Sequence, residues 1–158
     1  MKMWNQIVDH TCRWLCRTFP SRTRVVPRAD SPEIGMLTQF KLVPKILYLQ
    51  HFEEPESKDY FHRHRWHYMR SWVLSGHYVE ERPGMLITRR AGTTYSMNHQ
   101  TVHRVDSWSK DCWTLFLMLK PDDDWGYYER SGTRLGKFTH WRQFLKARVP
   151  SLETGKIT

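Results

Sequence analysis

Between residues 45 and 129, short apolar and aromatic segments alternate with turn residues. Segments that are rich in aromatic and β-branched side chains and bounded by Gly, Pro, Ser or Asp are typical of β-strands. Many short strands joined by tight turns favour a sandwich or barrel, because such folds leave few strand edges exposed. The expected strands are residues 45–52, 60–67, 72–74, 77–81, 85–90, 102–108, 113–119 and 125–129, and the expected turns are 55–57, 75–76, 83–84, 91–92 and 121–124.

The N-terminal segment has helical periodicity instead. Apolar positions recur there at spacings of three and four, which predicts a helix over residues 3–18 with one apolar face, and Pro20 follows it. Between Pro20 and Gly35 the composition changes to Ser, Arg, Pro and Asp without periodicity, so a mobile connector is expected. The folded body is expected to begin near Met36.

A shorter helix is expected near the C-terminus. Thr139 can cap it, and Trp141, Phe144 and Leu145 lie at helical spacing. A chain of 158 residues is within the range of one domain. The predicted organisation is a basic helix and linker over residues 1–35, a barrel over 36–148 and a tail over 149–158.

The chain is strongly basic, and part of that charge is concentrated in its middle. The formal net charge of +9 favours contact with anions such as phosphates, nucleotides, nucleic acid or carboxylates, although a merely solvated basic surface is the alternative. Between residues 61 and 105, the only acidic residues are Glu80 and Glu81. The arginines of the same segment are Arg63, Arg65, Arg70, Arg82, Arg89, Arg90 and Arg104.

Cysteine usage and hydropathy indicate a cytoplasmic protein. Cys12, Cys16 and Cys112 are too few and too unevenly placed for a disulfide framework, which fits a reducing compartment. No stretch approaches the roughly 18 consecutive apolar residues of a membrane span. The first twenty residues are basic and amphipathic, so an organelle-targeting helix is the alternative for that segment.

Candidate chemistry centres on the histidines of the expected strand 60–67. Side chains alternate between the two faces of a strand, so His62 and His64 point to one side while Arg63 points to the other. Two imidazoles on one face can ligate one metal ion. A third ligand must come from elsewhere, and the expected strand 102–108 offers His103.

These residues resemble the two-motif metal site of the cupin superfamily. The first motif of that family runs His-x-His, three or four residues, Glu, six residues and Gly, and this chain carries His62, His64 and Gly76 at the matching spacing. The second motif contributes a later histidine, which corresponds to His103. Over about residues 45–146 the chain is similar to small bacterial and phage cupins, which implies a small jelly-roll barrel, or double-stranded β-helix, with one metal ion. The segments that carry this similarity are 62–66, 74–80, 90–91, 103–105, 114–116, 125–127 and 141–144.

The motif glutamate is missing from this chain, because Met69 stands at its position. A thioether suits a soft metal, but packing in the core is the expected role of Met69. Glu80 or His99 could complete the site, although His99 is expected on a loop. Without either, three histidines remain, a set that serves Zn²⁺ and, in some cupins, Fe(II) oxygenases. Structural or solvent-facing histidines are the alternative, since nine histidines make a chance His-x-His pair more frequent.

The sequence therefore favours a metal-dependent enzyme, for which Fe(II) is the leading cofactor and Zn²⁺, Mn²⁺ and Ni²⁺ are alternatives. A dioxygenase acting on a small anionic substrate is the expected oxidoreductase activity. Arg70, Arg90 and Arg104 are candidates to hold the substrate, since a guanidinium fork suits carboxylate or phosphate, and Tyr78 and Arg104 are candidates for catalysis.

Two other functions remain open. A non-catalytic cupin could bind an anionic small molecule or nucleotide in the same cavity, because arginine beside aromatic residues can grip phosphate and stack a base. A nucleic-acid-binding accessory protein could use the basic N-terminal segment. A homodimer, formed through strand edges or the N-terminal apolar face, is compatible with each function.

Several weaker signals favour packing or solvation over chemistry. Cys12, Cys16 and His10 lack a fourth zinc ligand, and the thiol of Cys112 is expected to be packed beside Trp113. The aspartates of residues 122–124 are expected in a solvated turn. A glycine-rich phosphate loop, a nucleophile elbow and a paired-cysteine zinc motif are all missing from the sequence, which makes those enzyme classes poor candidates.

Overall fold

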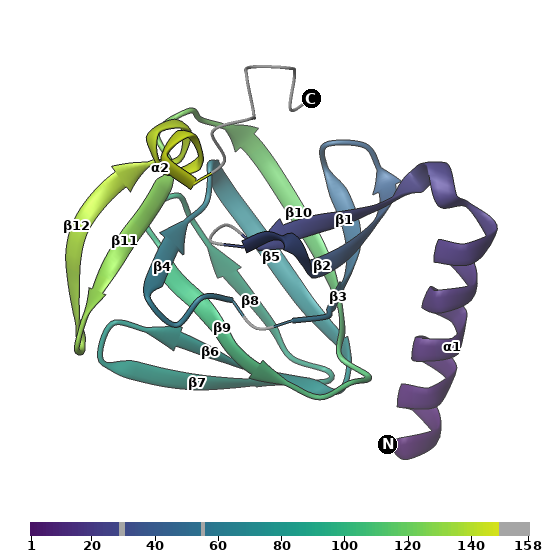
Figure 1. The fold of residues 1–158 in the computed structure, drawn as a ribbon. Coiled ribbons are helices and arrows are strands. Elements are labelled where there is room, and N and C mark those ends of the chain that lie inside the picture. Colours follow the sequence, from purple (N-terminus) through teal and green to yellow (C-terminus); the bar gives the residue numbers. More distant parts are fainter. Residues whose placement is uncertain (29–30, 55, 149–158) are drawn as a thin grey trace.

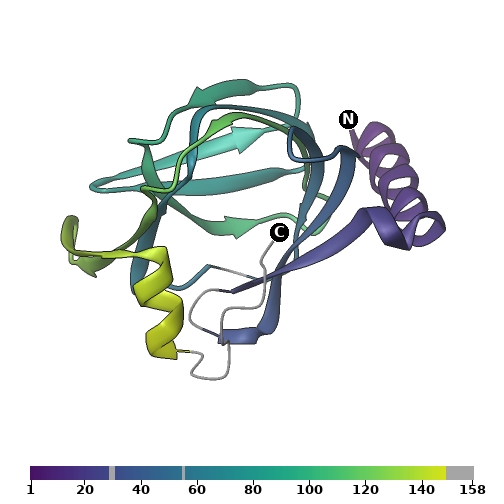
Figure 2. The ribbon, with the colours of Figure 1, turned by 90° about the horizontal axis from the view of Figure 1, so that it is seen from above.

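The computed structural model describes residues 1–28, 31–54 and 56–148. Its strands form two six-stranded antiparallel sheets that curve around a common interior, with a long helix at one side and a short helix near the C-terminal end (Figures 1 and 2). From β3 to β10 the chain passes repeatedly from one sheet to the other. This confirms the expected all-β jelly roll with an N-terminal and a short C-terminal helix.

The elements have the following bounds. The helices are α1 (Lys2–Thr18), the 3-10 turn η1 (Pro20–Arg22) and α2 (Trp141–Arg148). The first sheet contains, in spatial order, β1 (Thr23–Arg28), β2 (Ser31–Val43), β3 (Leu47–Phe52), β10 (Trp113–Pro121), β5 (Trp66–Ser75) and β8 (Thr94–Met97). The second sheet contains β12 (Arg134–His140), β11 (Gly126–Ser131), β4 (Tyr60–Arg63), β9 (Val102–Trp108), β6 (His77–Arg82) and β7 (Met85–Arg90).

The expected strand 60–67 is in fact the point where the chain changes sheets. β4 ends at Arg63 and pairs with β9 and β11, whereas β5 begins at Trp66 and pairs with β10 and β8. His64 therefore lies just beyond β4. Composition could not reveal this break, because both strands have aromatic and charged residues in the same pattern. The sequence also missed β8 and β12, and Thr139 belongs to β12 instead of capping α2.

The connector expected between Pro20 and Gly35 also differs from the structure, since it contains η1, β1 and the start of β2. β1 pairs antiparallel with β2, which in turn pairs with β3, so this segment extends the first sheet. A strand at a sheet edge is held by backbone hydrogen bonds and needs no apolar periodicity, as the 58% exposed Val25 illustrates. The predicted tail of residues 149–158 and position 55 lie outside the described residues.

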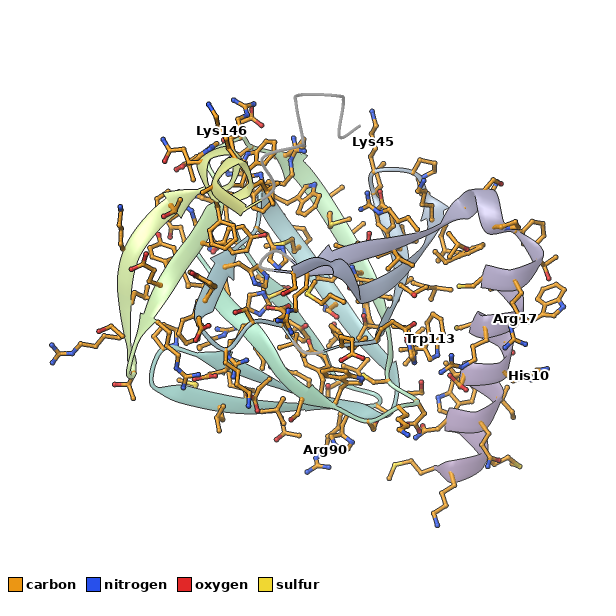
Figure 3. All side chains as sticks on the ribbon, in the orientation of Figure 1. His10, Arg17, Lys45, Arg90, Trp113 and Lys146 are labelled. Carbon is orange, nitrogen blue, oxygen red and sulfur yellow. The ribbon has the colours of Figure 1, made fainter. Side chains whose placement is uncertain are left out.

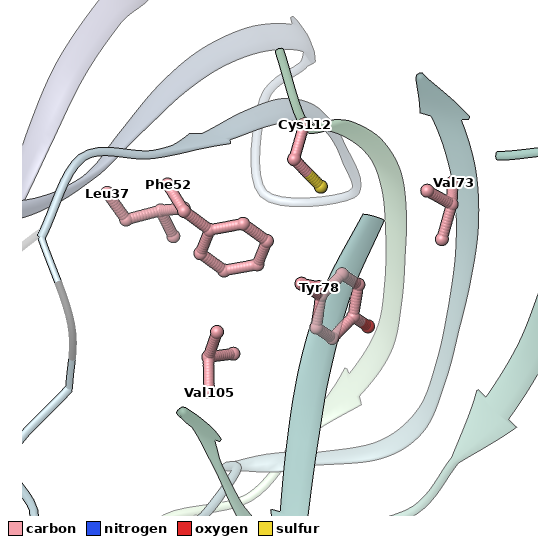
Figure 4. Packing of buried hydrophobic residues seen from close by; sticks show 6 residues of the cluster. All are labelled: Leu37, Phe52, Val73, Tyr78, Val105 and Cys112. Carbon is pink, nitrogen blue, oxygen red and sulfur yellow. The ribbon is translucent and has the colours of Figure 1, made fainter. Parts of the chain in front are cut away.

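The main core lies between the two sheets. Leu37 and Phe52 of the first sheet pack against Tyr78 and Val105 of the second, and the buried thiol of Cys112 lies beside them (Figure 4). Cys112 has no exposed surface, which confirms the expected packed thiol, and burial raises its pKa to about 12. A neighbouring cluster contains the fully buried Met69, as expected, and its other members are Tyr48, Met97, Phe116 and Met118.

The outer face of the first sheet is covered by α1. Val8 and Cys12 of the helix pack against Phe40, Leu49 and Trp113, and the carboxylate of Asp9 accepts a hydrogen bond from the Trp113 indole at 2.9 Å (Figure 3). The first sheet therefore has an inner face toward the barrel core and an outer face toward the helix. This arrangement gives the cysteines of α1 a packing role.

Gly76 closes the turn between β5 and β6 in a conformation that other residues avoid. Its φ angle is +63°, and a Cβ there would lie 2.8 Å from Asp111 Oδ1, 2.9 Å from Cys112 Cα and closer still to Ser109 Oγ. The substitution Gly76→Ala is expected to lower the free energy of unfolding by about 2 kcal/mol, because it adds a backbone clash to the cost of a positive φ. Denaturant titration measures this change.

Gly92→Ala is the matched control for Gly76→Ala. Gly92 also has a positive φ, +84°, but nothing lies within 4 Å of a Cβ at that position. It is expected to cost about 1 kcal/mol, the backbone contribution alone. Equal losses in the two variants would show that the crowding at Gly76 has no energetic effect.

Candidate metal centre

Two neighbouring strands of the second sheet bring three imidazoles together. His62 of β4 stands directly opposite His103 of β9 in the antiparallel register. His64 follows β4 at the crossing between the sheets, and its ring approaches the rings of both other histidines, with centroid separations of 4.7 and 5.0 Å. The strand register therefore assembles a group that is spread over 42 positions of the sequence.

The Nε2 atoms of these histidines converge. His64 Nε2 lies 3.4 Å from His62 Nε2 and 2.9 Å from His103 Nε2, and the three candidate ligand atoms all lie within 4.8 Å of one another. A metal bound about 2.1 Å from each nitrogen separates two such nitrogens by about 3.0 Å at a right angle and about 3.4 Å at the tetrahedral angle. The residues present thus fit one divalent metal ion.

Carboxylates stand behind two of the three imidazoles. Glu56 Oε2 lies 3.0 Å from His62 Nδ1, and Glu80 Oε1 lies 3.4 Å from His103 Nδ1. A carboxylate at Nδ1 holds the proton on that nitrogen and leaves the Nε2 lone pair free for a metal. The Glu56 contact is a hydrogen bond, whereas the Glu80 separation is longer than an ordinary one.

The charge states of the imidazoles follow from burial and from their neighbours. Burial and the adjacent His62 and His103 lower the pKa of His64 well below its usual value. Burial also lowers the pKa of His103, and the opposing effect of Glu80 does not restore it. At His62, burial acts in the same direction, but the carboxylate of Glu56 outweighs it and raises the pKa. His64 and His103 are therefore held in the neutral form that ligates metals.

Glu80, the expected carboxylate ligand, lies on the Nδ1 side of His103 instead of beside the converging Nε2 atoms. Its side chain is fully buried, and its two oxygens accept hydrogen bonds from Arg82 at 2.7 Å and Arg89 at 2.9 Å. Burial alone would raise the pKa of Glu80, but these partners and His103 lower it to about 2. This ionised carboxylate is placed to orient His103.

The three arginines expected to hold a substrate lie on outer faces of the barrel. Arg70 alternates with the buried Met69 and Ser71 of β5, and its side chain contacts Trp72 instead. Arg90 is exposed and projects away from the barrel (Figure 3). The third, Arg104, is engaged in ion pairs with Glu81 and Asp106.

Arg104 and Tyr78, the expected catalytic residues, are both engaged in buried contacts. The Arg104 guanidinium binds Glu81 at 2.7 Å and also contacts Asp106, on the face of β9 opposite His103. The Tyr78 hydroxyl hydrogen-bonds the Tyr95 hydroxyl, within the apolar core. From the sequence alone, strand alternation predicts that the side chains of Arg104 and His103 point to opposite faces of the strand.

His99 pairs with another histidine outside the cluster. Its ring lies 4.5 Å from the ring of His67, whose Nε2 is 3.2 Å from the carboxylate of Asp122. The neighbouring aspartates form surface ion pairs, since Asp124 binds Arg63 at 2.6 Å and Asp123 binds Arg142 at 3.1 Å. The aspartates of this turn thus form ion pairs with arginines.

The sequence did not identify Glu56 or Arg89 as a residue of the site. Glu56 lies in the loop before β4, where no periodicity assigns it a direction, and its contact with His62 depends on the folding of that loop. Arg89 was noted only as part of the basic segment, but it is the arginine of β7 that turns inward, toward Glu80 and the ring of Tyr95. The register of β6 with β7 could have identified Arg89, and no sequence signal marks Glu56.

The strand arrangement is that of a jelly roll of two antiparallel sheets. Solved structures similar to the chain include KdgF from Halomonas sp. (17% identity, 55% of this chain and 84% of that chain, TM-score 0.43) and Streptomyces PAC13 with uridine (14%, 72% and 89%, TM-score 0.46). A third is a sugar phosphate isomerase of the cupin superfamily from Silicibacter pomeroyi (12%, 75% and 85%, TM-score 0.47). At such identities the similarity concerns the fold.

Sequence comparison adds no closer relative. No protein-family model matches the chain, and no curated protein matches it significantly. In the described part of the chain, no helix is long and apolar enough to cross a membrane. The function must therefore be argued from the residues of the site.

Proposed function

We propose that the chain is a mononuclear metalloenzyme in which His62, His64 and His103 hold one divalent metal ion. The convergence of the three Nε2 atoms carries this proposal, because the two separations from His64 Nε2, 3.4 and 2.9 Å, match those of nitrogens that share a metal. Three protein ligands leave coordination positions open for a substrate. His103 is buried and His62 and His64 are partly buried, and imidazole nitrogens that meet one another there without a shared cation leave their lone pairs poorly compensated.

Fe(II) is the proposed metal, and a dioxygenase is the proposed class of enzyme. Histidine ligands with vacant positions suit ferrous iron, which supplies activation of dioxygen when it is bound. The protein contributes orientation and exclusion of water. Glu56 and Glu80 hold two imidazoles in place, and the rings of Trp66 and Phe116 stand 6.2 and 6.0 Å from the ring of His64.

The proposed substrate is a small anion that reaches the site from the side of Arg82 and Arg89. These two guanidinium groups face a single carboxylate, Glu80, which leaves one excess positive charge next to His103. Both arginine side chains retain partial exposure, 31% for Arg82 and 18% for Arg89. The two arginines can therefore attract an anion to this side of the site, while Glu80 and the ring of His103 stand between them and the Nε2 atoms.

Metal analysis of protein purified without added metal tests the proposal. We expect about one first-row metal ion per chain in the wild-type protein and almost none in the double variant His62→Ala/His64→Ala. His67→Ala/His99→Ala is the matched control, because it removes two neighbouring histidines outside the cluster and should keep the metal. A wild-type protein that binds no first-row metal with useful affinity would contradict the proposal.

The open coordination positions can be tested separately from the identity of the substrate. Nitric oxide added to the anaerobic Fe(II) form is expected to give the electron paramagnetic resonance signal of a ferrous nitrosyl centre. A protein that binds iron but gives no such signal has a closed site, and this result would exclude the dioxygenase while leaving metal binding intact.

A further inference from the structure

Helix α1 has more apolar surface than the barrel covers. Val8 and Cys12 face the first sheet and are buried there. Three other apolar residues of the helix point away from this contact, and we call them the outer stripe: Met3 is 74% exposed, Ile7 52% and Trp14 53%. They recur at spacings of four and seven, so they form a line along the helix. Trp4 is also exposed, but its indole donates a hydrogen bond to the Leu74 carbonyl of the barrel at 2.9 Å. Phe19, next to the helix end, is 44% exposed and contacts Trp14 edge-on.

The outer stripe is accessible along its whole length. In two perpendicular views, α1 is the outermost element on its side of the molecule (Figures 1 and 2). His10 and Arg17 lie on the side of the helix away from the barrel residue Trp113 (Figure 3). A flat surface could therefore approach α1 without meeting the barrel first.

Within residues 1–28 nearly all charged side chains are basic. Residues 1–28 contain a single acidic side chain, Asp9, and it is turned toward the barrel, where it binds Arg13 and Trp113 at 2.8 and 2.9 Å. The basic residues of the same segment are Lys2, Arg13, Arg17, Arg22, Arg24 and Arg28. An apolar line flanked by cations on an exposed helix is complementary to an anionic surface with an apolar layer beneath it.

A second copy of the chain is a poor match for this face. Each copy carries a net charge of +9, and pairing through α1 would bring two basic segments together. Tryptophan, in addition, favours the boundary between lipid headgroups and acyl chains, and Trp14 lies in the outer stripe.

We propose that α1 is a peripheral membrane anchor that lies flat on anionic phospholipid. The outer stripe inserts at the level of the headgroups and upper acyl chains, while Arg17 and Arg22 pair with lipid phosphates. The helix does not span the bilayer. The barrel, attached through Val8 and Cys12, is carried to the membrane surface, and this role is independent of the metal centre.

Co-sedimentation with lipid vesicles tests the anchor in the full-length chain. We expect binding to vesicles that contain phosphatidylglycerol, little binding to pure phosphatidylcholine, and weaker binding at higher salt. Ile7→Ser/Trp14→Ser should lower the partition coefficient at least about tenfold, because it removes two inserting side chains. Quenching of tryptophan fluorescence by brominated lipid should fall in the same variant.

Two further variants keep the result interpretable. Met85→Ser/Leu86→Ser removes two apolar residues of similar exposure, 56% and 66%, at the turn between β6 and β7, and should bind as the wild type does. Arg17→Glu/Arg22→Glu leaves the apolar stripe intact and should also weaken binding about tenfold or more, since each charge near the surface contributes about fivefold. Circular dichroism and thermal unfolding establish that each variant is folded.

Three results would overturn the proposal. One is failure of the wild-type protein to bind anionic vesicles at low salt. Another is an equal loss of binding in the stripe variant and in the Met85/Leu86 variant. The third is a dimer, detected by light scattering, that dissociates on Ile7→Ser/Trp14→Ser while no vesicle binds, which assigns the stripe to a second copy.

Discussion

Saturation of the metal-free protein with a divalent metal is expected to raise its free energy of unfolding by about 4 kcal/mol when the free metal is at a thousand times its dissociation constant. The increase arises because the three converging Nε2 atoms exist together in the folded chain alone. His64→Ala should reduce the increment to below about 1 kcal/mol. This variant is the sharpest choice, since His64 Nε2 approaches the Nε2 atoms of both His62 and His103.

The quantity to compare is the metal-dependent increment within each variant, measured by denaturant titration with metal and with a chelator. His64→Ala also changes packing beside Phe116 and Trp66, and the increment is insensitive to that change. His67→Ala serves as the control and should keep the full increment, because His67 lies outside the cluster. Equal increments in wild type and His64→Ala would place the metal elsewhere.

Glu80→Ala is expected to lower the free energy of unfolding by about 3 kcal/mol even without metal. The carboxylate is fully buried and joins Arg82, Arg89 and His103. Removal of one partner from a buried ion pair leaves uncompensated charge, which costs about 3–5 kcal/mol. The lower end of that range applies, because Arg82 and Arg89 keep some contact with solvent. Denaturant titration in the presence of a chelator measures the loss.

Asp124→Ala is the matched surface control for Glu80→Ala. Asp124 forms an ion pair of 2.6 Å with Arg63, a contact as short as those of Glu80, but its side chain is 68% exposed. Its removal should cost less than about 1 kcal/mol, because the carboxylate that is removed is largely solvated and water screens its pair with Arg63. Similar losses in the two variants would mean that burial does not strengthen the Glu80 network.

His64→Ala and Glu80→Ala also distinguish the metal ligands from the groups around them. His64→Ala removes a ligand and leaves the ion pairs of Glu80 intact, whereas Glu80→Ala leaves three ligands but frees the Nδ1 side of His103. The loss of an orienting carboxylate typically weakens metal affinity by about 10- to 100-fold without abolishing it. Together they distinguish the ligands from the groups that orient them.

Much of the fold could be predicted from the sequence because local composition carries the information. Strands β6, β7, β9 and β10 were expected within two residues of their observed bounds, as was helix α1. Their aromatic, β-branched and apolar residues recur with a period that reports which face is buried. Turn residues such as Gly76, with its positive φ, mark where those strands end.

The candidate site could be predicted in part for the same reason. Alternation along the expected strand predicts His62 and His64 on one side, and the resemblance to cupins connects them with His103. In the structure β4 ends at Arg63, and His64 joins the other two from the crossing between the sheets. Alternation also predicts that the side chains of Arg104 and His103 point to opposite faces of their strand, and that those of Arg90 and Arg89 do the same. Substrate residues chosen by charge alone therefore fall on the outer faces of the barrel.

By itself the sequence determined the strand-rich character and the terminal helices, because each depends on residues near one another in the chain, and the resemblance to cupins indicated the three histidines as candidate ligands. Tertiary structure alone decided that the chain changes sheets at His64, that β1 joins the first sheet, and that Glu56 and Glu80 stand behind two imidazoles. These features depend on which distant segments pair and in what register. Backbone hydrogen bonding sets that register, and it leaves no periodic trace in the side chains.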